Sequence, residues 1–187
     1  MRLDKIYNIS NGILKTRIEE VNDGKDIGIF TKEHFDLEFG RTCEITEMEY
    51  VKVDPSKYII TKVGDVLIDS LTAEAIIITK QTAGLLVLFN YFVLNKIQDS
   101  IDDYYFINWF NNSTELKRQL NVSLQGSAIK KISLSQLSDL KINVDPPNLQ
   151  KNIGGLYKNI IEKEKLLNKK NVLLNLILKD LANRKDE

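Results

Sequence analysis

The chain has 187 residues, no net formal charge and 43% hydrophobic residues, which allows one packed domain with an appendage. No apolar run reaches the roughly 18 residues of a membrane span, and MRLDKIYNIS lacks the hydrophobic region of a signal peptide, so we expect a cytoplasmic protein. The single cysteine, Cys43, excludes an internal disulfide and is expected to be a buried or half-buried free thiol.

The first half of the chain is predicted to be rich in strands. Alternating or β-branched runs predict strands at residues 13–18, 27–30, 43–53 and 57–63. After a turn at Val63-Gly64-Asp65, further strands are predicted at residues 66–71, 75–79 and 85–94, and the last two should be buried. His34, the only histidine, lies in the acidic stretch EHFDLE and is expected on the solvated surface.

Helical signals begin at Asp102-Asp103. Four aromatic residues follow at helical spacing, which is more typical of a core than of a binding platform: Tyr105, Phe106, Trp109 and Phe110. A second short helix is predicted at residues 113–120. Ser133 and Gln136 fit the capping-box pattern, so a helical turn should follow over residues 134–140. A last strand is predicted at residues 140–144, and the double proline that follows must end it.

The remaining residues predict one long helix with Asn148 as its N-cap. Apolar residues recur at every seventh position: Ile153, Ile160, Leu167, Leu174 and Leu181. The companion heptad positions are Leu149, Leu156, Lys163, Lys170 and Ile177. A helix of about 35 residues is roughly 50 Å long, more than a domain of this size can cover. Part of the stripe should therefore meet another helix, although a helix folded back on its own domain remains the alternative.

Residues with catalytic or metal-binding patterns are absent from the sequence. No cysteine or carboxylate is spaced with His34 as a metal-binding set, and there is no nucleophile or phosphate-binding motif. Asp145-Pro146-Pro147-Asn148 resembles the Asp-Pro-Pro-aromatic motif of N6-adenine methyltransferases, but asparagine stands where an aromatic ring must stack on the base. We therefore expect no enzyme activity, cofactor or metal.

Charge is unevenly distributed along the chain. Residues 148–187 carry nine basic and five acidic groups, and the preceding residues carry an acidic excess of four. This balance argues against a non-specific nucleic-acid coat, which needs a broad basic face. It remains compatible with a protein that reads base edges.

Several short motifs follow one another in a definite order. They are Gly-Asp-Val-Leu (64–67), a Tyr/Phe-rich helix ending in Asn-Ser (104–113), Gly-Ser (126–127), a basic pair (130–131), Ile-x-x-x-x-Leu (132–137), an aliphatic strand (140–144), Pro-Pro (146–147) and Gln150. In this order they resemble one target-recognition domain and its spacer helix from the DNA specificity subunit of type I restriction–modification systems. The resemblance is clear over residues 60–165 and weak before them. GILKTR (12–17) replaces the family's usual Gly-Gly-Thr-Pro loop, and Gln150 lies one residue closer to the prolines than usual.

The resemblance implies an α+β protein with a target-recognition domain at residues 1–147 and a spacer helix at residues 148–187. It implies a half-length specificity subunit that binds double-stranded DNA and directs a modification methyltransferase subunit, and through it a restriction subunit, to a bipartite site. Contacts with DNA are expected from two loops: Lys15, Thr16 and Arg17, and Gln125, Ser127, Lys130 and Lys131. The alternative is a coiled-coil adaptor or a decayed specificity fragment that no longer reads DNA.

The heptad pattern further predicts a homodimer through antiparallel C-terminal helices. In a parallel pair, Lys163 and Lys170 would each face their own copies. In an antiparallel pair centred near Leu167, these lysines can reach Glu162 or Glu164 of the partner copy, and the apolar ends cover each other. Two recognition domains related by a twofold axis would then read two inverted half-sites.

Overall fold

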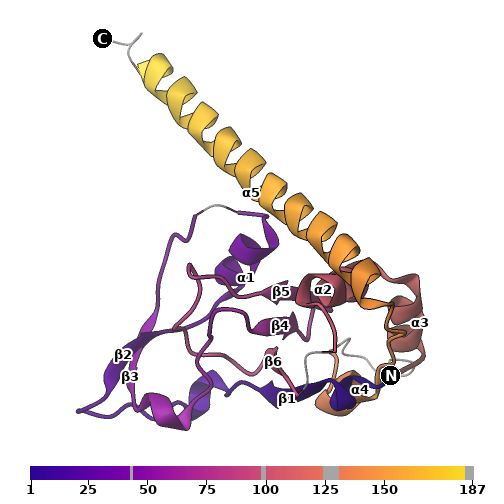
Figure 1. Ribbon diagram of the computed structural model, residues 1–187. Coiled ribbons are helices and arrows are strands. Elements are labelled where there is room, and N and C mark those ends of the chain that lie inside the picture. The colour runs from indigo at the N-terminus through magenta and orange to yellow at the C-terminus, as the bar shows by residue number, and fades with distance from the viewer. Residues whose placement is uncertain (43, 98–99, 124–130, 184–187) are drawn as a thin grey trace.

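A four-stranded antiparallel sheet lies at the centre of the molecule, and one long helix projects from the domain built on it (Figure 1). The computed structural model describes residues 1–42, 44–97, 100–123 and 131–183. The sheet has the order β1-β6-β4-β5, with β1 at Tyr7–Asn11, β4 at Val66–Asp69, β5 at Glu74–Ile77 and β6 at Tyr91–Lys96. A separate antiparallel pair consists of β2 (Lys25–Gly28) and β3 (Tyr50–Val53). The predicted α+β class is confirmed.

Helices occupy most of the second half of the chain. The helices there are α2 (Asp103–Asn112), α3 (Thr114–Ser123), α4 (Leu134–Asp139) and α5 (Pro147–Asn183). The first half contains α1 (Lys32–Phe39) and the short 3-10 turns η1 (Leu3–Lys5), η2 (Lys15–Arg17) and η3 (Pro55–Lys57). The start signals act as predicted. The Asp102 carboxylate accepts a 2.8 Å hydrogen bond from the Tyr105 amide, and Ser133 and Gln136 form the capping box of α4.

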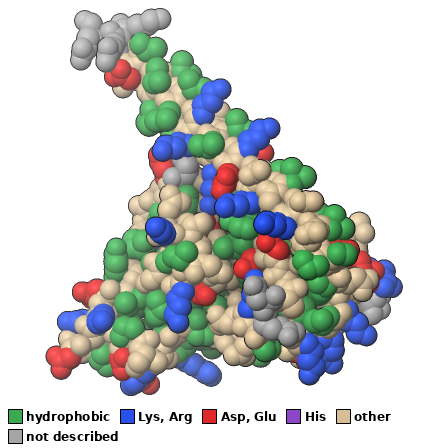
Figure 2. All heavy atoms as spheres, viewed as in Figure 1, with side chains coloured by type: hydrophobic (Ala, Val, Ile, Leu, Met, Phe, Trp, Pro, Cys, Tyr) green, Lys and Arg blue, Asp and Glu red, His purple; other side chains and the backbone are tan. Residues whose placement is uncertain are grey.

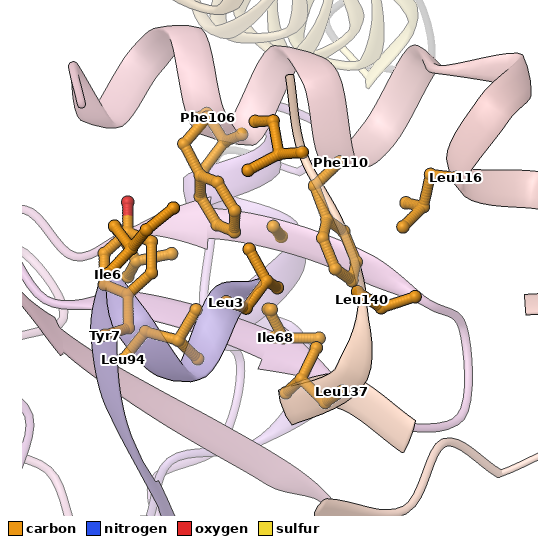
Figure 3. Close-up of a cluster of buried hydrophobic side chains, with 14 of the residues drawn as sticks. Leu3, Ile6, Tyr7, Ile68, Leu94, Phe106, Phe110, Leu116, Leu137 and Leu140 are labelled. Carbon is orange, nitrogen blue, oxygen red and sulfur yellow. The ribbon is translucent and has the colours of Figure 1, made fainter. Parts of the chain in front are cut away.

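The largest apolar cluster packs α2 and α4 on the sheet (Figure 3). Phe106 and Phe110 are buried and point from α2 towards Ile68 and Leu94 of the sheet. Tyr105 is also buried, and Trp109 packs half-buried at the edge of the cluster. The aromatic stripe is therefore core, as its helical spacing predicts.

The predicted strands are longer than the observed ones. Residues 85–94 form one strand only from Tyr91 onward, because the preceding part pairs through isolated bridges of Leu86 and Leu88. Residues 13–18 contain η2 instead of a strand, and only the end of 43–53 pairs, as β3. Residues 140–144 make a single bridge between Lys141 and Arg2, because their partner is the short N-terminal segment. The strand β1 was not predicted.

The prediction for His34 is wrong, because this residue is fully buried in α1. Its Nδ1 accepts a 3.1 Å hydrogen bond from the Thr31 amide, so the ring caps the helix from its third position. The ring also lies 5.5 Å from that of Phe30, between centroids. Glu33 is half-buried and Glu38 is buried with His34, so the acidic stretch does not indicate a solvated surface. Cys43 lies outside the described residues.

Burial of His34 predicts a loss of stability in mild acid. Burial lowers the pKa of its imidazole below the ordinary value of 6.5. The unfolded chain therefore takes up a proton near pH 6.5 and the folded chain only at lower pH, so the free energy of unfolding falls as pH drops through this window. Urea unfolding on both sides of pH 6.5 should show this slope in the wild type and a smaller one in His34→Gln. Equal slopes would contradict it.

The long helix begins two residues earlier than an N-cap at Asn148 predicts. Pro147 is its first residue, and the Pro146 carbonyl accepts the first helical hydrogen bond, from Gln150. Asn148 is thus inside the helix rather than its N-cap, since proline suits the first helical position, where an amide hydrogen is not needed. No helix among the described residues is both long and apolar enough to span a membrane.

Two buried residues of α5 attach it to the domain. Gln150 accepts a 2.9 Å hydrogen bond from the Asp102 amide and donates one of 2.7 Å to the Asp145 carbonyl. Gly154 lies against the start of α2 so closely that an added Cβ would be 2.2 Å from Asp102 Oδ1. Helix α5 and the N-cap of α2 therefore share one tightly packed contact.

Candidate DNA interface and exposed helix face

Four loops lie together at one end of the central sheet, where β1 and β4 end and β5 and β6 begin. We call this surface the loop edge: residues 12–17, 70–73, 86–90 and 131–132. The Phe89 amide donates a 2.8 Å hydrogen bond to the Ile13 carbonyl, and the Asn90 carbonyl accepts one of 2.9 Å from the Ser70 amide. The Ile132 amide donates to the Ser70 carbonyl at 2.8 Å. Backbone hydrogen bonds thus hold segments from the start, the middle and the end of the domain sequence together in one surface.

Glycine at position 12 permits this arrangement. A Cβ at Gly12 would lie 2.3 Å from the Leu88 carbonyl oxygen, so only glycine lets the two loops approach this closely. The chain then continues directly into η2, which carries Lys15, Thr16 and Arg17. All three are exposed, and Lys15 forms a 2.7 Å ion pair with Glu49.

Lys131 lies at the same edge but is partly covered. Its Nζ is 3.7 Å from the centroid of the Phe89 ring, a cation–π contact. Burial lowers the pKa of this ammonium group, against the effect of the nearby Asp69 carboxylate. The structure therefore brings Lys131 beside the loop that adjoins η2. The other predicted residues of this segment, Gln125, Ser127 and Lys130, lie outside the described residues.

Phe89 is a candidate that sequence reasoning missed. It is 40% exposed at a loop tip, although the sequence places it in a run that reads as one buried strand. Its amide and the neighbouring Asn90 carbonyl are both bonded to other loops of the edge, so the ring is held in a fixed position. The Asn90 that interrupts the apolar run was the available signal for a turn.

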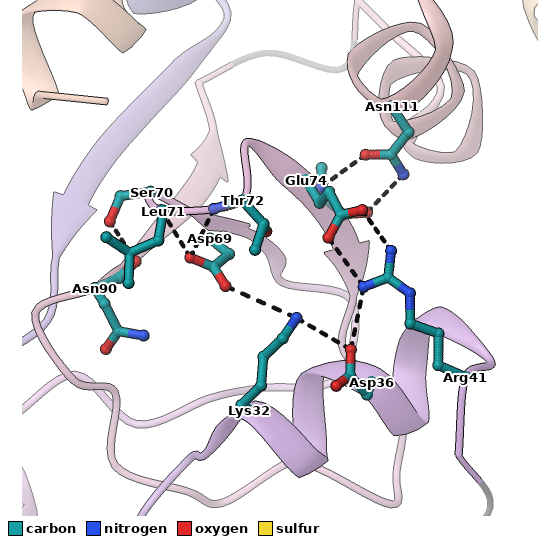
Figure 4. A network of polar contacts seen from close by, with 11 residues as sticks. Lys32, Asp36, Arg41, Asp69, Ser70, Leu71, Thr72, Glu74, Asn90 and Asn111 are labelled. Atoms are coloured by element: carbon teal, nitrogen blue, oxygen red, sulfur yellow. Dashed lines mark hydrogen bonds and ion pairs between the residues drawn. The ribbon is translucent and has the colours of Figure 1, made fainter. Parts of the chain in front are cut away.

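A network of ion pairs joins α1 to the β4–β5 turn, which is part of the loop edge (Figure 4). Arg41 contacts Glu74 at the start of β5 and Asp36 of α1, the latter at 3.2 Å. Lys32 lies 3.0 Å from Asp36 and 3.9 Å from Asp69. These two cations are thus engaged with carboxylates that join α1 to the β4–β5 turn, and their first role is structural.

Helix α5 presents two different faces. Its inner face packs on the domain and consists of Gly154, Tyr157, Ile161, Lys165, Asn168 and Val172. Its outer seam consists of the exposed residues Leu156, Ile160, Leu167, Leu174, Ile177 and Leu181. The four of these from the predicted heptad stripe are between 40% and 51% exposed. Figure 2 shows hydrophobic side chains along the projecting part of the helix, interspersed with lysines.

Ile153, the first residue of the predicted stripe, behaves differently from the others. It is half-buried and packs against the main core cluster, together with Tyr157 and Ile161. The first part of the helix therefore packs on its own domain, as the alternative prediction allowed. The residues that pack there belong mostly to the inner face and not to the heptad stripe. The rest of the heptad stripe remains available to another helix.

Comparisons with known proteins identify the fold. No family model matches the sequence, and no curated protein is similar to it. Several solved structures are similar, including the following three. The type I restriction–modification S subunit from M. genitalium has 17% identity, with a TM-score of 0.52 over 99% of this chain. The HsdS subunit from Thermoanaerobacter tengcongensis has 16% identity and a TM-score of 0.52 over 91%.

The third is a chain from a structure of complex assembly and conformational transition in the type I R-M system, with 17% identity and a TM-score of 0.57 over 97% of this chain. The chain spans about two fifths of each match: 42%, 39% and 42% of their lengths. An α+β domain followed by one long helix is thus shared with part of each structure. The chain therefore has the fold of one part of a type I restriction–modification S subunit, its domain and the helix that follows.

Proposed function

We propose that this protein is a half-length specificity subunit that recognises one half of a bipartite DNA site and carries out no chemistry itself. One observation carries the proposal: nearly the whole chain, the domain and then the helix, matches about two fifths of each of three S-subunit structures. The order of motifs from Gly64 to Gln150 supports the same conclusion independently of the coordinates.

The loop edge is the surface that we assign to DNA. Exposed Arg17 and Thr16 can reach base edges or phosphates, and Lys131 can add a contact with the backbone. A bidentate arginine–guanine pair contributes about 1–3 kcal/mol of discrimination between bases. The half-exposed Phe89 ring can make apolar contact with a thymine methyl group, which lies in the major groove.

The outer seam of α5 would join two such chains in an antiparallel pair. The two loop edges would then be related by a twofold axis and would read inverted half-sites. The modification methyltransferase subunit would dock on α5 and the adjacent domain, and a restriction subunit would join through that complex. Co-purification with a type I modification methyltransferase subunit that is co-expressed with this protein tests this assignment, and separate elution at micromolar concentration would count against it.

DNA binding is tested by selection from random duplexes, with and without that methyltransferase. We expect enrichment of one short half-site and an affinity that falls linearly with the logarithm of salt concentration, because phosphate contacts release counterions. An adaptor or decayed fragment would recover no motif and show no salt-dependent binding.

Arg17→Ala should relax the selected sequence at one position and weaken binding by about 1–3 kcal/mol. Lys80→Ala is the matched control, since Lys80 is exposed beyond the opposite end of β5. The assignment of the loop edge is wrong if both variants bind like the wild type, or if the Lys80 variant alone is weakened.

A further inference from the structure

A second attachment, distant from Gln150 and Gly154, holds α5 against the end of α1. The Lys165 ammonium donates a 2.8 Å hydrogen bond to Glu38 Oε2. The Glu38 side chain is fully buried, and that of Lys165 is 25% exposed. The two residues are 127 positions apart in the chain, so this ion pair is a tertiary contact between the domain and the helix.

The other oxygen of Glu38 is held by the turn that follows β5. Its Oε1 accepts hydrogen bonds from the Thr79 amide at 3.0 Å, the Thr79 hydroxyl at 2.7 Å and the Thr82 hydroxyl at 2.6 Å. Burial by itself raises the pKa of this carboxyl, but the hydrogen bonds from Lys165 and the two threonines outweigh it and leave the pKa below its ordinary value. Glu38 is thus an anion that two threonines of the domain and Lys165 of α5 hold in one orientation.

A backbone contact adjoins this ion pair. The Asn168 side-chain amide donates to the Gly40 carbonyl, and Gly40 ends α1 in the left-handed conformation with φ at 89°. A Cβ at Gly40 would meet Glu164 and Lys165 of α5 at 3.4–3.5 Å. We call Glu38, Gly40, Lys165 and Asn168 the clamp. Its contacts are polar and directional, as is the 2.9 Å hydrogen bond that Asn111 donates to the Tyr157 hydroxyl nearer the start of α5.

The clamp and the attachment at Gln150 and Gly154 together define the angle between α5 and the domain. Gly154 and Lys165 are eleven residues apart on a continuous helix, or about 16 Å. The contacts of Gly154, Tyr157 and Ile161 attach only the first turns of α5, and the clamp adds a contact further along the helix that restricts its direction. Figure 1 shows α5 crossing over α2 and passing α1 before it projects beyond the domain.

We propose that the clamp sets the distance between the two DNA half-sites by fixing the angle between the reading domain and α5. This inference rests on the proposed function, and it names the contact that determines the spacing of the two half-sites. Glu38 and Lys165 are positioning residues, because they act through the orientation of the domain rather than by contact with DNA.

A small rotation of the domain about α5 is enough to change the half-site spacing. A domain of about 147 residues has a radius of gyration of about 15 Å, so its centre lies about 20 Å from a pivot at its side. A rotation of about 10° would then displace the centre of the domain by about 3.5 Å. That displacement equals roughly one base-pair step of 3.4 Å. Loss of the clamp would therefore admit neighbouring spacings.

Glu38→Gln tests the inference with little disturbance of the domain. The glutamine Oε1 can keep the three bonds from Thr79 and Thr82, while its amide hydrogens replace the oxygen that faces Lys165. The readout is selection from duplexes that carry two inverted half-sites at a series of spacings. We expect the wild type to select one spacing, and the variant to select the same half-site bases over a broader range of spacings.

Lys169→Met is the matched control, since Lys169 is exposed on the same helix and outside the clamp; Lys165→Met is the second clamp variant. The control should keep the wild-type spacing, and Lys165→Met should broaden it. Unchanged spacing in both clamp variants would overturn the inference. A change in the selected bases, rather than in their spacing, would also overturn it.

A distance measurement separates this inference from the proposed function. Spin labels on the domain and near the end of α5, in a chain with Cys43 replaced by serine, report the angle without DNA. The distance distribution should be narrow in the wild type and broader in Glu38→Gln. If the wild type selects no DNA, the proposed function fails, and a broadened distribution still establishes the clamp. An unchanged distribution shows that the clamp does not fix the angle.

Discussion

Replacing Leu167 by glutamate is expected to convert the proposed dimer into monomers whose domain remains folded. Leu167 lies at the centre of the outer seam, and 40% of its surface is exposed in the single chain. Burying a leucine side chain contributes about 1.5–3 kcal/mol, and the substitution removes this twice while placing a charge in the interface. Sizing with light scattering, together with far-UV circular dichroism, measures both parts of the expectation.

Lys169→Glu serves as the control, because it introduces the same charge on the same helix away from the outer seam. It should remain dimeric. The assignment fails if the wild type is monomeric at micromolar concentration or if Leu167→Glu still dimerises. A single cysteine placed at position 181 of a chain with Cys43→Ser reports direction, since a disulfide with its own copy would show that the helices are parallel.

The adjacent glycines Gly154 and Gly155 should respond in opposite directions to alanine. In a helix interior alanine is about 1 kcal/mol more favourable than glycine. A Cβ at Gly155 meets nothing within 4 Å, so Gly155→Ala should stabilise the protein by about that amount. A Cβ at Gly154 would be 2.2 Å from Asp102 Oδ1 and 2.9 Å from the Tyr105 amide. Overpacking of this kind costs about 1–3 kcal/mol.

Gly154→Ala also displaces Asp102, whose carboxylate caps α2, and loss of a cap costs about 1 kcal/mol more. The net effect should therefore be destabilising despite the better helix propensity. Urea unfolding of the two variants measures the difference. Similar midpoints for both would mean that α5 does not lie against the start of α2 as described.

Most helices could be predicted because their signals are local. Asp102 and the Ser133–Gln136 capping box mark starts, and the aromatic spacing of α2 marks a buried face. Helix α1 gives no such signal. Its buried side includes two polar residues, His34 and Glu38, so apolar periodicity fails there. The partner of His34 is the nearby Thr31, but the partners of Glu38 lie far away in the chain.

The strands were overpredicted for a related reason. β-branched and apolar runs report burial, but whether a run joins a sheet depends on a partner strand. Leu86 is buried and extended, yet it pairs through single bridges with Ile29 and Ile60. The same limit hid Phe89, because an apolar run does not reveal that its middle turns outward beside Lys131.

For the long helix, the heptad pattern predicted the exposed face but not the face that packs on the domain. The pattern indicated the surface that the domain leaves uncovered, from Ile160 to Leu181. It could not indicate the inner face, where Gly154, Lys165 and Asn168 make the contacts. These residues are small or polar and depend on Asp102, Glu38 and Gly40 for their role.

The arrangement of the half-sites in selected DNA tests the central claim most directly. Duplexes bound by the wild-type chain, in complex with its methyltransferase, should carry two copies of one short sequence in inverted orientation at one fixed spacing. This result follows from two identical loop edges related by a twofold axis through the antiparallel α5 helices. Direct repeats, a single half-site without a second, or two unrelated sequences would contradict the account.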